Sequence, residues 1–275
     1  MTGLRLFGAL IPGDYARTFV YLNGIYKPRV ALRRLLNTFY RMDHVYSVIN
    51  EFKKNYKGPF SILEFGVADG YAFTKKVFAT RYLNVEDAII CHGFDSFEGI
   101  PETEDPRDRA SVDGGDWKAG EYRGRYDELH AYLTKKYKNW RLHRGLFEAT
   151  LTADVLEELR THKPILVWID CDYYTSARTV LERLIPYLPS GCVIYFDEYE
   201  FNFGSRFTGE ARLIHEINTG AFGQSIELVL DKELSWDLSR CYRFVNERAT
   251  NRLERLAELR HATDLRKRGN DSPLP

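Results

Sequence analysis

The chain has 275 residues, of which 44% are hydrophobic and 14% aromatic. This is enough apolar material for a folded core, so the composition excludes a chain that is disordered throughout. Lysine plus arginine and aspartate plus glutamate each number 39, which gives a formal net charge of zero. Because no overall positive field attracts polyanions, we expect neither a nucleic-acid partner nor an anionic membrane surface.

Cysteine usage and the N-terminal segment indicate the compartment. The four cysteines lie inside or beside apolar runs with no CxxC spacing, which favours free thiols in a reducing compartment over disulfides or a zinc site. The six-residue run LFGALI is interrupted at once by Pro12 and Gly13, so it is too short for a signal segment or a membrane span. We therefore expect a cytoplasmic protein without a membrane span.

Apolar runs and helical segments alternate along the chain. Apolar residues at helical spacing in residues 28–56 predict one or two helices ahead of the first strand. The expected strands are 60–66, 88–95, 140–145, 165–170, 192–198, 225–231 and 240–246. The expected helices are 71–83, 124–138, 152–161, 175–187 and 209–219. This alternation is typical of an open doubly wound α/β sheet, and the short link between the last two strands predicts an antiparallel hairpin at its edge.

Composition also divides the chain. We expect a helical extension over residues 1–57, a catalytic core over 58–247, and a charged C-terminal helix and tail over 248–275. Residues 98–124 are rich in Gly, Asp, Glu and Pro and predict a long loop. Such a loop either covers a functional site, with Trp117 and Tyr122 closing over it, or is mobile.

Two apolar runs end in paired acids. ILVWIDCD closes on Asp170 and Asp172, and CVIYFDE closes on Asp197 and Glu198. Runs of this kind predict strands buried on both faces of a parallel sheet, whose chemistry lies beyond the carboxyl ends of the strands. If the two strands are neighbours, Asp170 and Asp197 lie about 5 Å apart. Clustered carboxylates need a cation among them, and oxygen ligands alone favour Mg²⁺, Mn²⁺ or Ca²⁺ over zinc.

The first strand leads into a glycine turn, EFGVADG, which contains Glu64, Gly66 and Gly70. Ala68 stands where the dinucleotide pattern GxGxxG has its second glycine, which disfavours a pyrophosphate ligand. Asp95, at the end of the second strand, can accept hydrogen bonds from both hydroxyls of a ribose. Together these features favour a nucleoside without phosphates, and S-adenosylmethionine fits because an acidic lining suits its sulfonium charge. The alternative is a turn whose glycines serve only the fold.

Several ordered motifs resemble the macrocin O-methyltransferase family across roughly residues 60–215. They are FDSFEGIP, HRGLFEATL, WIDCDYYTSA and SGCVIYFDEY, with a loop that contains Gly114, Asp116 and Trp117. The resemblance implies a class I, Rossmann-like, mostly parallel seven-stranded sheet with N-terminal helical additions. It also implies methylation of sugar hydroxyls of natural products by S-adenosylmethionine, with a divalent cation such as Mg²⁺, and association into a homo-oligomer.

The same resemblance assigns the cofactor residues. Glu64 and Gly66 match residues against the methionine part of S-adenosylmethionine, and Asp95 matches the ribose ligand. The residues that match the surroundings of the adenine are Ser96, Phe97, Gly145, Leu146 and Phe147.

The resemblance also separates the acids by role. Asp170, Asp197 and Glu198 match the metal ligands, although the family usually has a second Asp where this chain has Glu198. Asp172 matches the residue that acts as the base in some relatives, where it takes the proton of the acceptor hydroxyl. The structural alternative for Asp172 is that it caps a helix beginning near Thr175, since Asp is a common N-cap residue.

Other functions stay open at this point. A phenolic or catechol acceptor would suit the same chemistry, and a nucleoside-binding scaffold without catalysis would keep the same fold. A dehydrogenase is disfavoured because the chain lacks GxGxxG and a Tyr-x-x-x-Lys pair placed for hydride chemistry. We expect His92, His143 and His215 to be structural rather than catalytic.

Overall fold

The computed structural model describes residues 43–110, 117–236 and 239–258. The chain divides into two compact units, Met1–Tyr46 and Ser47–Pro275, and the second holds the sheet. One expected N-terminal helix is present as α4 (Asp43–Asn55). Residues 1–42 of that extension, and the loop residues Gly114 and Asp116, lie outside the described residues.

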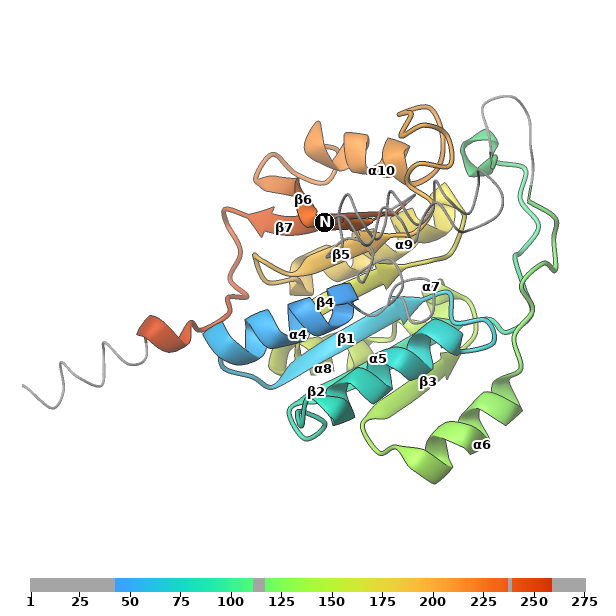
Figure 1. Ribbon diagram of the computed structural model, residues 1–275. Coiled ribbons are helices and arrows are strands. Elements are labelled where there is room, and N and C mark those ends of the chain that lie inside the picture. The colour runs from blue at the N-terminus through green and yellow to red at the C-terminus, as the bar shows by residue number, and fades with distance from the viewer. Residues whose placement is uncertain (1–42, 111–116, 237–238, 259–275) are drawn as a thin grey trace, which may run out of the picture. The chain divides into compact units, whose positions relative to one another are not determined.

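Seven strands of the described chain form one sheet in the order β3-β2-β1-β4-β5-β7-β6 (Figure 1). The strands are β1 (Phe60–Phe65), β2 (Ile89–Asp95), β3 (Trp140–Arg144), β4 (Lys163–Ile169), β5 (Val193–Phe196), β6 (Ile226–Trp236) and β7 (Ser239–Asn246). The first five in this order are parallel, whereas β7 runs antiparallel to both β5 and β6. The predicted Rossmann-like, mostly parallel sheet with an antiparallel edge hairpin is confirmed.

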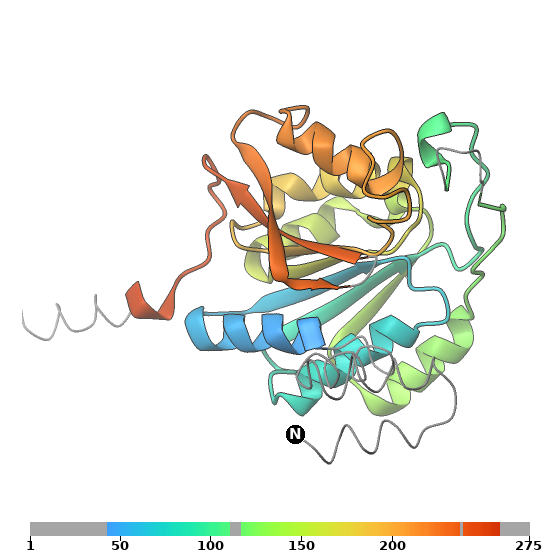
Figure 2. The ribbon, with the colours of Figure 1, turned by 45° about the horizontal axis from the view of Figure 1, so that its top comes forward.

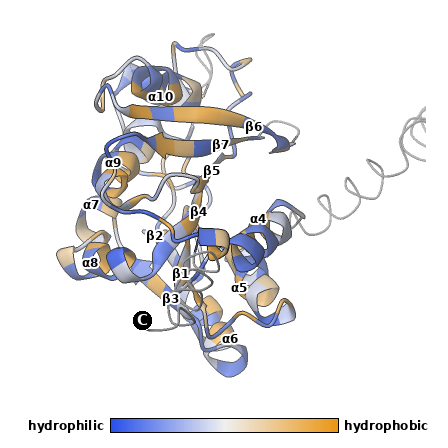
Figure 3. Ribbon diagram, turned by 90° about the vertical axis from the view of Figure 1, so that its left-hand side faces the viewer, coloured by the Kyte–Doolittle hydropathy of each residue, from blue (hydrophilic) through white to orange (hydrophobic). Residues whose placement is uncertain are grey.

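Helices cover both faces of the sheet (Figure 3). On one face lie α5 (Tyr71–Tyr82) and α6 (Tyr126–Lys136), and on the other lie α8 (Ala153–Thr161), α9 (Tyr174–Leu184) and α10 (Gly209–Asn218). Every residue of β1 and β5 is buried, which explains why their sequences are apolar apart from Ser61 and Glu64 of β1. The described parts of the long loop, residues 98–110 and 117–124, lie at the side where the parallel strands end (Figure 2).

Aromatic rings cross three strands in a continuous ladder. Phe65 on β1 stacks on Phe94 of β2 at 4.7 Å between ring centroids, and Phe94 stacks on His143 of β3 at 4.3 Å. His92 Nδ1 and His143 Nε2 are 3.1 Å apart, so one ring donates a hydrogen bond to the other. Both histidines belong to the packing of the sheet, as expected.

One helix and one strand, α9 and β6, end at other residues than predicted. The helix expected over 175–187 stops at Leu184 and continues as a short 3₁₀ helix, η3 (Ile185–Tyr187), since Pro186 has no N–H to extend the α-helical pattern. β6 runs on to Trp236 instead of ending at Asp231, with an irregular register in between. There the Asp231 carboxylate accepts the N–H of Leu234 at 3.1 Å.

Two short helices were not predicted, and the C-terminal segment differs from its prediction. η2 (Pro106–Asp108) lies inside the long loop, and α7 (Phe147–Thr150) follows β3. In the segment expected as a C-terminal helix, residues 251–254 have no helical structure. No helix of the described residues is long and apolar enough to cross a membrane.

Candidate active site

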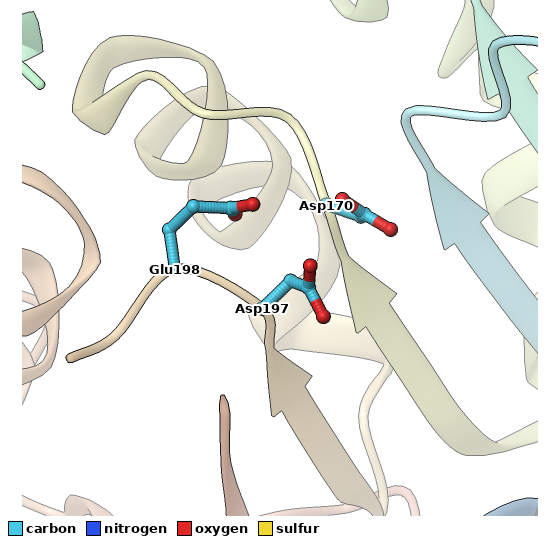
Figure 4. A group of neighbouring side chains, drawn as sticks. All are labelled: Asp170, Asp197 and Glu198. Atoms are coloured by element: carbon cyan, nitrogen blue, oxygen red, sulfur yellow. The ribbon is translucent and has the colours of Figure 1, made fainter. Parts of the chain in front are cut away.

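Three carboxylates meet where two neighbouring strands end (Figure 4). Asp170 follows β4, and Asp197 and Glu198 follow β5. Ile169 pairs with Phe196 in the parallel register, so the next residue of each strand stands beside the other. Each of the three acids offers a carboxylate oxygen within 4.8 Å of the others. The predicted closeness of Asp170 and Asp197 is confirmed.

Burial makes this cluster electrostatically costly. It raises the pKa of the Asp170 carboxyl well above its ordinary value, and the charge of Asp197 raises that pKa further. The pKa of Glu198 is also raised, by burial first and then by Glu210. Glu198 Oε2 is buried and has no hydrogen-bond partner among the described residues. Clustered carboxylate oxygens fit a hard cation such as Mg²⁺, Mn²⁺ or Ca²⁺, whose charge would relieve this repulsion.

Neighbouring side chains orient two of these acids. The Trp168 indole N–H donates to Asp170 Oδ2 at 3.2 Å. The Ser239 hydroxyl donates to Asp197 Oδ1 at 3.2 Å, and the Tyr195 hydroxyl donates to the same oxygen. Such outer contacts fix the direction of metal ligands. Trp168 and Tyr195 each precede an acid by two residues, so strand alternation could have revealed them. Ser239 lies on the adjacent strand β7 but 42 residues after Asp197 in the sequence, so no local pattern links the two.

Asp172 does not cap the following helix, α9. Its φ is 61°, a left-handed conformation that is costly for a residue with a side chain and is concentrated at functional sites. The N-terminus of α9 has no side-chain cap from its N-cap residue, and the Thr175 N–H donates to Asp108 Oδ1 at 2.8 Å. The capping alternative for Asp172 is therefore wrong. Burial and then the charge of Asp197 raise the pKa of Asp172 to about 7, which suits a general base.

The glycines of the turn after β1 are required by close packing. Gly66 has φ 93°, and a Cβ there would lie 1.7 Å from the carbonyl oxygen of Asp170. Gly70 has φ 77°, and a Cβ there would lie 2.4 Å from Leu129 Cδ1. The turn after β1 is thereby held directly against the end of β4, beside the acid cluster.

Backbone N–H groups of this turn are used inside the protein. Those of Val67 and Ala68 donate to Asp95 Oδ2 at 2.7 and 2.8 Å. These donors are therefore not available to a phosphate, in keeping with the predicted nucleoside ligand. The next residue, Ser96, closes a small turn of its own, with its hydroxyl donating to the Gly99 carbonyl at 3.3 Å.

The residues predicted around the adenosine gather at the ends of β2 and β3. The Gly145 N–H donates to the Asp95 carbonyl at 2.8 Å, and the Phe97 N–H donates to Asp95 Oδ1 at 2.5 Å. Leu146 is 55% exposed. The rings of Phe97 and Phe147 are instead packed inside the protein, Phe97 with 3% exposure and Phe147 against the core.

Glu64, on β1 before the glycine turn, forms a buried ion pair with Lys76. Its Oε2 is 2.6 Å from Lys76 Nζ of α5, and the side chains are 1% and 2% exposed, respectively. Lys76 Nζ also lies 3.6 Å from the centre of the Trp168 ring. Glu64 Oε1 has no hydrogen-bond partner in the described part of the chain. Because the Glu64 side chain is only 1% exposed, its contact with the methionine part stays a prediction.

A family model for Macrocin-O-methyltransferase (TylF) matches residues 23–222. The chain belongs to this family. It is therefore an O-methyltransferase, as predicted from the motifs around the acids. No curated protein sequence matches it.

Solved structures share the fold of this methyltransferase at low sequence identity. CalS11, a calicheamicin methyltransferase, is 20% identical over 88% of this chain and 90% of its own, with a TM-score of 0.57. The O-methyltransferase NovP is 19% identical over 74% of this chain and 79% of its own, with a TM-score of 0.55. An apo structure of CalS11, described as a TDP-rhamnose 3'-O-methyltransferase, is 19% identical over 88% of this chain and 91% of its own, with a TM-score of 0.51.

The methyltransferase has one more acid beside the cluster, which was not predicted. Glu210, the second residue of α10, is 2% exposed, and its Oε2 accepts the Glu198 N–H at 3.1 Å. Burial and then the charge of Asp197 raise its pKa well above the ordinary value. The burial of Glu210 could have been predicted from helical spacing, because the apolar residues Leu213 and Ile214 follow it by three and four residues on the same face of α10.

Proposed function

We propose that this methyltransferase uses S-adenosylmethionine to methylate a sugar hydroxyl of a natural product or polysaccharide, assisted by a divalent cation at Asp170, Asp197 and Glu198. The observation that carries the proposal is the cluster of three carboxylates within 4.8 Å, beside Asp172 and the glycine turn. The sugar acceptor is supported by the family and by the description of CalS11 as a TDP-rhamnose 3'-O-methyltransferase.

For the cofactor, we propose that Asp95 receives the ribose, with Gly145 and Leu146 against the adenine. Asp95 already accepts three backbone N–H groups, so its position is fixed before the ligand arrives. We assign Gly66 and Glu64 to the side of the methionine part on the family resemblance, with Glu64 itself buried in its ion pair with Lys76. S-adenosylmethionine supplies a methyl group activated by its sulfonium charge, and the neighbouring acids favour that charge electrostatically.

For the chemistry, Asp172 accepts the proton of the acceptor hydroxyl. Burial raises the pKa of this carboxyl above its ordinary value, which makes it a stronger base than an exposed aspartate. The cation supplies Lewis acidity that makes the hydroxyl more acidic. Trp168 and Ser239 hold Asp170 and Asp197 in fixed directions, so that the hydroxyl and the methyl group are positioned by rigid strand ends.

We also propose a cytoplasmic location and association into a homo-oligomer. Support for the location comes from the cysteines of the described chain, all of which are free thiols: Cys91, Cys171, Cys192 and Cys241. Free thiols are typical of a reducing compartment. The oligomer stays a prediction from the family resemblance.

The cation site is tested with Asp197→Asn. This change removes one charged ligand and leaves the side-chain volume unchanged, so we expect Mn²⁺ affinity to fall by at least about tenfold. Electron paramagnetic resonance of free Mn²⁺ measures the affinity without any acceptor. Formation of S-adenosylhomocysteine with a panel of glycosides measures the reaction, and we expect it to fall with the affinity.

Asp87→Asn is the matched control, because Asp87 is exposed and lies before β2, at the opposite end of the strands from the acids. It should leave Mn²⁺ affinity and methyl transfer unchanged. Unaltered Mn²⁺ affinity in Asp197→Asn would refute the assigned ligands. Absence of S-adenosylhomocysteine binding to the unaltered protein in calorimetry would refute the cofactor.

A further inference from the structure

Each of the two aspartates at the strand ends has one carboxylate oxygen engaged by neighbouring side chains. Asp170 Oδ2 accepts the indole N–H of Trp168 at 3.2 Å. Asp197 Oδ1 lies within hydrogen-bond distance of the hydroxyls of Tyr195 and Ser239, which are themselves 2.6 Å apart. A carboxylate oxygen has two lone pairs, so two hydroxyls are enough to occupy Asp197 Oδ1. A cation among these acids is therefore directed to the other oxygen of each aspartate.

The donors of these hydrogen bonds are held in place by stacking. Trp168 and Tyr195 are paired in register on β4 and β5, and their ring centroids lie 3.5 Å apart at an interplanar angle of 18°. The two residues are 1% and 2% exposed, respectively. Lys76 Nζ lies 3.6 Å from the centre of the Trp168 ring. Because rings packed in this way have no room to turn aside, their hydrogen bonds to the aspartates persist when a cation binds.

Glu198, the third acid of the cluster, differs from the two aspartates. Its Oε2 is buried and has no hydrogen-bond partner in the described part of the chain. The cluster then offers a cation at most four carboxylate oxygens, two from Glu198 and one from each aspartate. This number separates the candidate cations. Ca²⁺ takes about six to eight oxygens and often binds a carboxylate through both of its oxygens, whereas Mg²⁺ is octahedral and keeps several water ligands.

We propose that Trp168, Tyr195 and Ser239 make the cation site selective for Mg²⁺ over Ca²⁺ by restricting Asp170 and Asp197 to one ligand oxygen each. This inference rests on the proposed cation site and names the residues that set its specificity. They touch the aspartates and not the cation, so they are positioning residues. Without them the aspartates can rotate and present both oxygens, which favours Ca²⁺ more than Mg²⁺.

The test compares how Mg²⁺ and Ca²⁺ displace Mn²⁺, with free Mn²⁺ followed by electron paramagnetic resonance. It needs neither the cofactor nor an acceptor. In the unaltered protein we expect Mg²⁺ to bind more tightly than Ca²⁺. Tyr195→Phe/Ser239→Ala removes both hydroxyls beside Asp197, and should raise the affinity for Ca²⁺ relative to Mg²⁺ by at least about tenfold, as outer contacts do at other metal sites. Trp168→Phe, which removes the N–H beside Asp170, should change the ratio in the same direction.

Tyr174→Phe is the matched control. Tyr174 is also fully buried, and its hydroxyl also donates to a carboxylate, that of Glu216 on α10. Glu216 is not one of the three clustered acids. This variant loses the same hydroxyl group as Tyr195→Phe, so it should leave the preference between the two cations unchanged.

Equal or tighter binding of Ca²⁺ by the unaltered protein would overturn the proposal, and this comparison needs no variant. An unchanged ratio of the two affinities in Tyr195→Phe/Ser239→Ala would overturn it as well. Where circular dichroism shows that the double variant does not fold, Tyr195→Phe alone decides, because it removes a single hydroxyl. Failure of Mn²⁺ to bind the unaltered protein would contradict the proposed cation site, whereas normal Mn²⁺ binding without a preference for Mg²⁺ contradicts only the selectivity.

Discussion

At the scale of single residues, the Glu64–Lys76 pair is the feature with the largest consequence for stability. Burial raises the pKa of Glu64 and lowers that of Lys76, and the attraction between the two opposes both shifts. Removing one partner of a buried pair leaves an uncompensated charge, whereas removing both is often nearly neutral. Lys76 could have been recognised as buried from its helical spacing with Phe73 and Thr80.

We expect Lys76→Met to lower the free energy of unfolding by about 3–5 kcal/mol. The double variant Glu64→Gln/Lys76→Met should recover most of this loss, because neither charge is left alone. Urea unfolding of the protein, both single variants and the double variant gives the coupling energy. Lys75→Met, on the neighbouring position over the Tyr71 ring, is the control. A loss of stability in the double variant equal to the sum of the two single losses would show that the charges are not coupled.

At the scale of elements, the long loop is fastened to α9 by one carboxylate. Asp108 ends η2, is 3% exposed, and accepts the Thr175 N–H and hydroxyl, each at 2.8 Å. The Thr103 hydroxyl donates to it at 2.7 Å. Asp108 therefore caps the helix that follows Asp172 from a position 67 residues earlier in the sequence. Local patterns offered only Asp172 as a possible cap, since they give no access to an acceptor so far away in the sequence.

Asp108→Ala should lower the free energy of unfolding by about 2 kcal/mol, because a helix cap and charged hydrogen bonds are lost together. Thermal or urea unfolding measures the loss, and hydrogen exchange should accelerate in the first turn of α9. Asp154→Ala is the comparison, because Asp154 lies exposed in the first turn of α8, where Thr152 provides the cap. Equal effects of the two substitutions would contradict the role of Asp108.

Element types were predictable where one pattern dominated. The buried strands β1, β4 and β5 and the helix α5 match their expected positions closely, because continuous apolar runs and turn residues define them. The end of the edge strand β6 was harder to predict. β6 continues past Asp231 with an irregular register, where the Asp231 carboxylate accepts the Leu234 N–H. The short α7 has four residues, too few for a periodic signal.

At the scale of the whole molecule, the stacked histidines His92 and His143 make the stability of the fold depend on pH. Burial lowers the pKa of His92 to about 3 and that of His143 to about 4. In the unfolded chain each imidazole takes up a proton near pH 6.5. The neutral rings therefore stabilise the fold above pH 6.5, and this contribution is lost as the pH falls from 6.5 toward 4, since the unfolded state then binds more protons.

The expected size is a loss of up to about 2 kcal/mol per histidine between pH 7.5 and pH 5. The variant His92→Leu/His143→Leu has neither titrating ring, so its free energy of unfolding should change less over this interval. Urea unfolding of both proteins at the two pH values gives the difference, which also removes the contribution of the buried acids. Parallel pH profiles of the two proteins would exclude the ladder as the origin.

The sequence by itself determined the doubly wound fold, the acids at the ends of two strands, and the family, because each of these follows from local patterns of residues. Only the tertiary structure decided that β4 and β5 lie in register, so that Asp170, Asp197 and Glu198 share one site. It also brought Ser239 and Glu210 to that site. Hydrogen bonds and burial join residues far apart in the chain, and no local pattern records which of them will meet.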